Sequence, residues 1–206
     1  MNRHLSPAEV QQAETLFPPL TDSLRELVDL AIRSEADEAD VRRAHALIGE
    51  AARLLGSRVA PHPGIRTAGD GGALTWGNVL IGNRNAIAPP LRVHRDDTGK
   101  VWADLVLGAA YEGPPGLVHG GVCALVLDHI LGATAHRPGE PAFTGTLTLR
   151  YVAPTPLGAL RAEAWVDRDD RGKTFAEGRL IDAAGTVTVQ AEGIFIRPKA
   201  NSGTRR

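Results

Sequence analysis

The feature that most constrains the fold of this chain is an apolar run at residues 122–132 that contains a single carboxylate, Asp128. A loop rich in glycine and proline, and then the tripeptide His119-Gly120-Gly121, come directly before it. The composition of the run predicts a helix, and a helix that is apolar on every side must be buried. We therefore expect one buried helix around which a domain is built.

The residues around this helix predict an antiparallel sheet. Before the helix, residues 91–94 are expected to pair with residues 101–107 across a turn. After it, four more strands are predicted, and short turns join the last three into an antiparallel meander. These four strands lie at about 142–152, 159–167, 174–182 and 186–197. A curved antiparallel sheet wrapped around the helix is the simplest way to bury it, so the expected fold class is α+β.

The first part of the chain reads as helical. Ser6 is the expected N-cap of the first segment, and Thr21 or Asp22 is expected to cap a second one. Asp37 begins a third amphipathic segment, for which Gly56 is a natural stop. We expect a helical extension at 1–56, a Gly/Pro-rich linker or long loop at 57–81, one α+β domain at 82–198 and a flexible tail at 199–206.

The charge and cysteine content exclude several classes of partner. The 206 residues carry a net charge of −1, with acids and bases interspersed, so neither nucleic acid nor a membrane surface is an expected partner. Cys123 is the one cysteine, which rules out an intrachain disulfide. The first residues do not resemble a signal peptide, and no segment approaches the roughly 18 apolar residues of a membrane span. We expect a cytoplasmic location.

The stretch at 111–121, with Asp128 nine positions after His119, resembles hotdog-fold acyl-CoA thioesterases. The closest similarity is to the PaaI-like branch of the 4-hydroxybenzoyl-CoA thioesterase superfamily, which has the His-Gly-Gly signature. Further similar features are Thr144, the strand exit at 150–156 and the segment at 172–175. The resemblance covers roughly 82–198. It implies a hotdog fold, hydrolysis of an acyl-CoA thioester to acid and CoA, no metal, and no cofactor apart from the CoA of the substrate.

Gly120 and Gly121 are expected to open the helix. Free N–H groups point outward at a helix start, and the helix dipole there favours negative charge. Glycine also lets a substrate approach the backbone. Since thioester hydrolysis develops negative charge on the carbonyl oxygen, we assign the Gly121 N–H to that oxygen, as the resemblance also implies, and Gly120 to substrate binding. Alternatively, the two glycines only form a tight junction between loop and helix.

Asp128 is the candidate nucleophile or general base. A buried, unpaired carboxylate is costly, and loss of solvent tends to raise its pKa. The alternative is a structural aspartate that is held by hydrogen bonds or faces solvent at the helix edge. An isolated aspartate in mid-helix would favour that alternative, whereas the His-Gly-Gly tripeptide at this spacing favours the catalytic role.

The spacing of the two groups predicts a site shared between subunits. Gly121 and Asp128 are seven residues apart, which puts them on almost the same helix face but about 10 Å apart along the axis. Reacting groups must approach to about 3–3.5 Å. We therefore expect Gly121 of one subunit to act with Asp128 of another, in a homodimer. Family members often pair such dimers into tetramers.

Two further residues are assigned mainly through the resemblance. His119 would shape the thioester pocket or polarise the carbonyl, although it could also be a loop histidine bonded to backbone. The Thr144 hydroxyl would orient the attacking water or hold Asp128. Simple β-propensity is the alternative for Thr144, because Thr146 and Thr148 are expected on the same face.

Three basic residues, Arg150, Arg171 and Lys173, could meet the phosphates of coenzyme A, or could only be solvated. Two other functions are also open: a hotdog dehydratase, for which we find no suitable Asp/His pair, and a non-catalytic protein that binds acyl-CoA or lipid. Aromatic residues make up only 4% of the chain, which favours aliphatic acyl chains. The acyl group and the role of residues 1–80 are not fixed by the sequence.

Overall fold

The computed structural model describes residues 3–60, 66–68, 73–136 and 141–198 of the chain. The predicted tail at 199–206 lies outside these ranges. The chain divides into two compact units, Met1–Ile87 and Ala88–Arg206, and each is described by itself. Within the described ranges, none of the helices combines the length and the apolar character that a membrane crossing requires.

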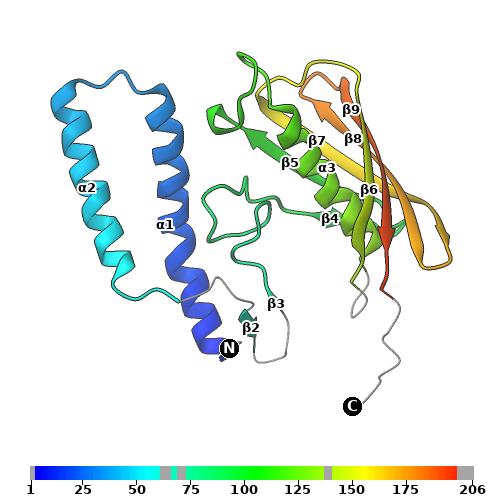
Figure 1. Ribbon diagram of the computed structural model, residues 1–206, viewed down its shortest axis with the longest axis horizontal. Helices are drawn as coiled ribbons and strands as arrows, with labels where there is room; N and C mark the ends of the chain where they lie inside the picture. Colours follow the sequence, from blue (N-terminus) through cyan, green and yellow to red (C-terminus); the bar gives the residue numbers. More distant parts are fainter. Residues whose placement is uncertain (1–2, 61–65, 69–72, 137–140, 199–206) are drawn as a thin grey trace. The chain divides into compact units, whose positions relative to one another are not determined.

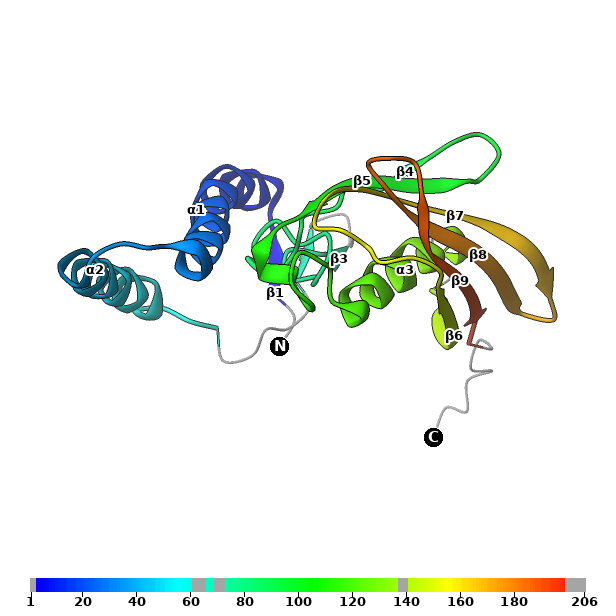
Figure 2. The ribbon, with the colours of Figure 1, turned by 90° about the horizontal axis from the view of Figure 1, so that it is seen from above.

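The second unit is a six-stranded sheet that curves around one helix, α3 (Gly120–Ala135) (Figures 1 and 2). All of its neighbouring strands pair antiparallel, in the order β4-β5-β7-β8-β9-β6. The strands are β4 (His94–Arg95), β5 (Val101–Leu107), β6 (Phe143–Tyr151), β7 (Gly158–Asp170), β8 (Lys173–Asp182) and β9 (Val187–Ile196). A short 3-10 helix, Ala109–Tyr111, follows β5. The predicted α+β plan is confirmed.

The apolar side chains of α3 form the core of this unit. Leu127, Ile130 and Leu131 are fully buried, and the helix contacts every strand from β5 to β9. Gly132 lets the helix approach the sheet closely, because a Cβ at this position would lie 3.3 Å from a ring carbon of Phe195. We call the side of the sheet that faces α3 the helix face, and the opposite side the outer face.

The strand order differs from a simple meander in one place. Strands β7, β8 and β9 follow one another as predicted, but β6 pairs with β9 and forms an edge of the sheet. At the other edge, β4 contains only His94 and Arg95 rather than residues 91–94. Pro89 and Pro90 precede this strand, and a proline has no N–H to donate to a sheet.

A β-bulge in β6 changes which side chains face the helix. Thr144 pairs with Phe195, whereas Thr146 pairs with Ile194, so the residue between them is extra. Paired residues share a face, and neighbouring residues in a strand face opposite sides. Because Phe195 packs against α3, Thr144 lies on the helix face and Thr146 on the outer face. The expectation that Thr146 and Thr148 share the face of Thr144 is therefore wrong.

The first unit contains two long helices, α1 (Pro7–Arg33) and α2 (Glu38–Gly56). Ser6 and Asp37 cap them as predicted. The predicted cap at Thr21 or Asp22 is wrong, because α1 continues through both residues. The Thr21 hydroxyl instead donates to the carbonyl oxygen of Phe17 at 2.9 Å, inside the helix.

Between the helices and the second unit, the predicted linker contains ordered structure. It supplies β2 (Arg66–Ala68) and β3 (Ala73–Leu74), which form a small sheet with β1 (Arg3–Leu5) from before α1, in the order β1-β2-β3. Trp76 and Leu80 are buried, and the Arg84 guanidinium lies over the ring of Phe17 at 3.3 Å.

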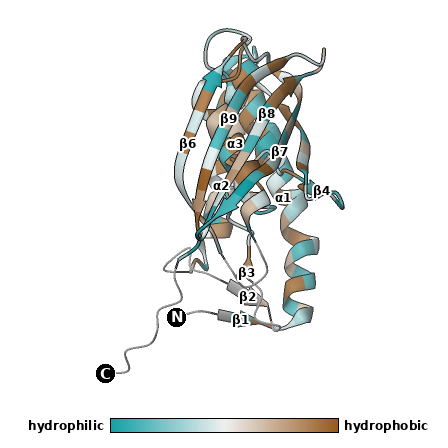
Figure 3. Cartoon of the chain, turned by 90° about the vertical axis from the view of Figure 1, so that its right-hand side faces the viewer, coloured by the Kyte–Doolittle hydropathy of each residue, from teal (hydrophilic) through white to brown (hydrophobic). Residues whose placement is uncertain are grey.

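Hydrophobic and hydrophilic residues alternate along α1 (Figure 3), and apolar side chains of both long helices are exposed to solvent. Leu16 of α1 is 61% exposed and Leu54 of α2 is 70% exposed. No residue of α2 is buried. The apolar spacing that predicts these helices therefore does not correspond to a core inside the first unit.

Candidate active site

The start of α3 is capped by a histidine. The Gly121 N–H donates to Nδ1 of His119 at 3.0 Å, and the His119 carbonyl accepts from the N–H of Val122 at 2.8 Å. Since Nδ1 accepts this bond, the proton of the neutral ring is assigned to Nε2. The backbone donor predicted for the substrate carbonyl is thus paired in this structure. A carbonyl oxygen could use the Gly121 N–H only after displacing the imidazole.

The loop before α3 holds His119 in place. The His119 N–H donates to the Tyr111 carbonyl at 2.9 Å, and the Gly116 N–H donates to the Glu112 carboxylate at 2.7 Å. Gly113 has no room for a side chain, because a Cβ would lie 2.8 Å from Cα of His119. Both His119 and Gly121 are nevertheless solvent-exposed, so an incoming group can reach them.

Asp128 lies in mid-helix and is half-buried rather than fully buried. The Thr144 hydroxyl donates to its Oδ1 at 2.9 Å, which joins α3 to the edge strand β6. Within the part of the chain that the structure describes, no other side chain hydrogen bonds to Asp128. Burial is the main cause that lowers the pKa of the neighbouring His129, against the opposing effect of the Asp128 charge. Asp128 thus keeps one carboxylate oxygen free of side-chain hydrogen bonds from the described residues.

The first turn of α3 has a second contact to β6 that sequence reasoning missed. The Tyr151 hydroxyl donates to the Gly120 carbonyl at 2.8 Å. Thr144 and Tyr151 lie on the helix face at the two ends of β6. Thr144 contacts Asp128, the predicted catalytic acid, and Tyr151 contacts Gly120, the predicted substrate-binding residue. The sequence spacing between Tyr151 and the helix does not predict this contact, because the bulge in β6 determines which face of the sheet Tyr151 occupies.

The three basic residues lie apart from Asp128. Arg150 stands in register with Gln190, which pairs with Arg179 on the outer face of the sheet. The side chain of Arg171, in the turn after β7, is 94% exposed, and Lys173 begins β8. The structure does not bring these three side chains together with Asp128 in one subunit.

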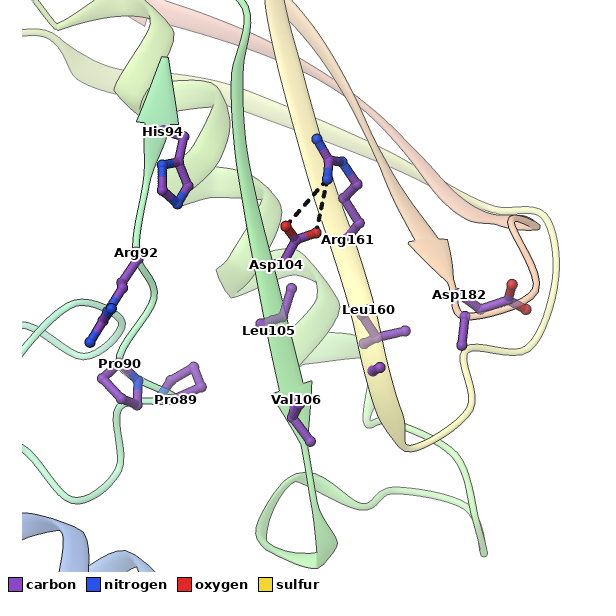
Figure 4. Close-up of a pocket in the computed structure, with 12 residues that line it drawn as sticks. Pro89, Pro90, Arg92, His94, Asp104, Leu105, Val106, Leu160, Arg161 and Asp182 are labelled. Atoms are coloured by element: carbon purple, nitrogen blue, oxygen red, sulfur yellow. Dashed lines mark hydrogen bonds and ion pairs between the residues drawn. The ribbon is translucent and has the colours of Figure 1, made fainter. Parts of the chain in front are cut away.

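A cavity of about 700 Å³ lies on the outer face beside β5 and β7 (Figure 4). Its charged side chains include Arg161 and Asp104, which form a hydrogen-bonded ion pair at 3.1 and 3.2 Å. The two groups satisfy one another, and the predicted catalytic residues Asp128, His119 and Gly121 do not line this cavity.

Next to this cavity, Glu163 is a nearly buried acid surrounded by three basic groups, with 8% of its side chain exposed. Lys100, Arg161 and Arg179 contact its carboxylate at 2.9–3.0 Å. Burial by itself would raise the pKa of Glu163, but the hydrogen bonds from these three groups lower it to about 2. The cluster stabilises the outer face of the sheet.

These features define the class of the protein. A curved antiparallel sheet around one apolar helix, with His-Gly-Gly at the helix start, is the hotdog fold. Residues 115–196 match the family model of the thioesterase superfamily. The crystal structure of a thioesterase superfamily protein is 33% identical, with a TM-score of 0.74, and the match covers 87% of this chain and 94% of that one. The chain therefore belongs to the thioesterase superfamily.

Other known proteins are similar over shorter stretches. The acyl-coenzyme A thioesterase THEM4 of Xenopus laevis is 30% identical over 92 residues, which are 44% of this chain and 41% of THEM4. The acyl-coenzyme A thioesterase THEM5 of Homo sapiens is 40% identical over 53 residues, 26% of this chain and 22% of THEM5. The chain thus spans less than half the length of these curated relatives. The E. coli PaaI protein from the phenylacetic acid degradation operon shares the fold, with a TM-score of 0.50 and 16% identity over 54% of this chain and 81% of PaaI.

We expect Glu163→Gln to lower stability in a pH-dependent way. The folded pKa of about 2 lies below the ordinary value of 4.5, so the ionised group contributes stability above pH 4.5 that is lost as the pH falls towards 2. The shift corresponds to on the order of 3 kcal/mol. Urea unfolding should show a deficit of this size at pH 7 that narrows below pH 4.5. Glu177→Gln, at an exposed outer-face position, is the control, and an equal deficit at all pH values would contradict the assignment.

Proposed function

We propose that the protein hydrolyses an acyl-CoA thioester to a free acid and CoA. The observation that carries this proposal is the Asp128 carboxylate, which Thr144 holds on the accessible face of the helix that begins with His-Gly-Gly. Membership of the thioesterase superfamily and the names of the relatives THEM4 and THEM5 support thioester hydrolysis with CoA as the leaving group. A hotdog protein of Bacillus halodurans with 20% identity and a TM-score of 0.52 was solved with CoA.

The catalytic unit in this proposal is a homodimer. Gly121 and Asp128 are separated by about 10 Å along α3, so one subunit supplies the backbone donor and the other supplies the carboxylate. Strand β6 is an edge strand, and its unpaired backbone groups suit association with a second copy. Because Thr144 on β6 holds Asp128, such an association would bring the carboxylate to the boundary between subunits. Pairing of dimers into a tetramer is compatible with this arrangement.

The reaction starts when the substrate carbonyl replaces the His119 imidazole at the Gly121 N–H. One donor of this kind can be worth about 10²–10³ in rate. Asp128 then attacks the carbonyl carbon, the C–S bond breaks, CoA leaves as a thiolate that takes up a proton, and water hydrolyses the resulting anhydride. Alternatively, Asp128 removes a proton from a water molecule that attacks directly. The oxygen of Asp128 that Thr144 does not bind is the one available for either route.

Two other functions would use the same fold differently. A non-catalytic protein would bind acyl-CoA or lipid without releasing thiol. A hotdog dehydratase would need an acid and a histidine placed at one carbon atom of the substrate. His129 follows Asp128 directly, so the two side chains point about 100° apart around the helix, which favours hydrolysis over dehydration.

We expect Asp128→Asn to abolish hydrolysis, with a loss of at least about 10²–10⁴ in rate. The rate is measured as free thiol released from a panel of acyl-CoA thioesters. Asp104→Asn, which alters an exposed aspartate on the outer face, is the matched control and should keep full activity. Full activity in Asp128→Asn would refute the proposed role, and thioester binding without thiol release by the natural protein would favour the non-catalytic alternative.

A single turnover in water labelled with heavy oxygen separates the two chemical routes. If Asp128 attacks and water then opens the anhydride at the aspartyl carbon, the label enters the Asp128 carboxylate, whereas general-base catalysis places it only in the acid product. Mass spectrometry of the peptide that contains Asp128 distinguishes them.

We expect Thr144→Val to lower kcat by about 10–100-fold with little change in KM. The variant removes a hydrogen bond to a charged group, which is worth about 1.5–3 kcal/mol, and lets the carboxylate rotate. Thr144→Ser should restore most of the rate, because it keeps the hydroxyl. Thr146→Val is the control, since Thr146 lies on the outer face of the same strand. A similar loss in both valine variants would show that the effect is structural.

A further inference from the structure

An apolar groove lies beside the first turn of α3. Its volume is about 430 Å³, and it is bounded by the loop before the helix, by the helix start and by the segment 151–155 after β6. Val118 and Cys123 form its base, with 5% and 1% of their surface exposed. Tyr151 and Val152 line its solvent side, with 54% and 44% exposed. None of the described residues that line the groove is charged.

The groove opens next to the proposed carbonyl site. Gly120 lines it, and the Tyr151 hydroxyl donates to the Gly120 carbonyl at 2.8 Å. A Cβ on Gly120 would lie 3.3 Å from the Tyr151 hydroxyl oxygen, so the phenol ring stands directly over this glycine. The next residue is Gly121, whose N–H we assign to the substrate carbonyl. The groove therefore begins one residue away from the donor that we assign to the substrate carbonyl.

The walls of the groove are fixed by backbone hydrogen bonds. The Val118 N–H donates to the Thr155 carbonyl at 2.9 Å, and the Val152 N–H donates to the Thr188 carbonyl at 2.9 Å. Leu117, which lines the groove, forms an isolated β-bridge with Pro156. The groove is thus formed before any ligand enters, which lowers the entropy cost of binding.

The chemistry of the lining favours hydrocarbon over the pantetheine arm of CoA. Pantetheine carries two amides, and a buried amide without hydrogen-bond partners is costly. The Val118 and Val152 N–H groups and the Thr155 carbonyl are already paired within the protein. Burial raises the pKa of the Cys123 thiol, so this residue stays neutral and packs as a small apolar side chain.

We propose that this groove binds the aliphatic chain of the acyl group, and that Val152 and Ala153 limit the length of chain it accepts. The inference rests on the proposed thioester hydrolysis, because it takes the position of the carbonyl from it. A volume of about 430 Å³ is within the range of small-molecule sites. The substrate class is then a straight-chain aliphatic acyl-CoA rather than a charged or strongly polar one.

The test measures binding, so that it does not depend on turnover. Thioether analogues of acyl-CoA, from ethyl to dodecyl, are titrated calorimetrically into the natural protein and into Val152→Phe. Each buried methylene should tighten binding by about fourfold until the groove is full. In Val152→Phe the affinity should stop rising at a shorter chain, while the ethyl analogue binds as before. Val106→Phe, at an exposed valine on the outer face of β5, should behave like the natural protein.

Two results would overturn the inference. The first is an unchanged dependence on chain length in Val152→Phe, and the second is an equal loss of affinity for every analogue, which would place CoA itself in the groove. If circular dichroism shows that Val152→Phe is misfolded, Ala153→Phe, at another lining position, takes its place in the same titrations. Loss of the thioesterase proposal would appear separately, as absence of thiol release from the natural protein with the length-dependent binding intact.

Discussion

The structure of the second unit depends on the burial of one apolar helix by a curved sheet. Leu127, Ile130 and Leu131 are fully buried, and α3 contacts all the long strands. This burial sets the direction and depth of the helix, and with it the positions of its polar groups. Its start is left exposed at the loop end, and Asp128 is left half-buried beside the edge strand β6. A group that is costly to bury thus lies where a substrate or a second subunit can reach it.

In the proposed mechanism, the histidine cap gives the helix start two states. In the described structure His119 satisfies the Gly121 N–H, so the unliganded helix has no unpaired donor at this position. A substrate carbonyl would exchange one acceptor for another rather than fill an empty site. The exchange breaks the existing hydrogen bond. A developing negative charge compensates for this loss better than a neutral carbonyl does, because charged acceptors bind N–H groups more strongly. In the proposed mechanism, the Gly121 N–H therefore favours the transition state over the ground state of the substrate.

Local patterns in the sequence predict the elements of the second unit well and their arrangement less well. The apolar run predicts α3, and alternation with tight turns predicts β7, β8 and β9. The position of β6 beside β9 and the bulge before Thr146 depend on contacts between distant residues, so no local pattern reports them. One extra residue in β6 decides that Thr144 reaches Asp128 and that Thr146 does not. In the first unit, the helical periodicity of α1 outweighs the cap signal at Thr21 and the two prolines before it.

The central claim is that one site is built from two subunits, and complementation between variants tests it most directly. Asp128→Asn removes the carboxylate, and Gly121→Pro removes the backbone donor. Proline is compatible with the first helical turn because the lost N–H donates to the His119 side chain and not to the helix backbone. The His119 ring must move aside, since a Cβ at this position would lie 3.2 Å from its Nδ1. Each variant alone should be inactive. Co-expressed and purified as a mixed dimer, they should regain thioesterase activity, because one interface then combines an intact Gly121 with an intact Asp128. Mixed dimers that form but stay inactive would contradict the account and place both groups of a working site in one chain.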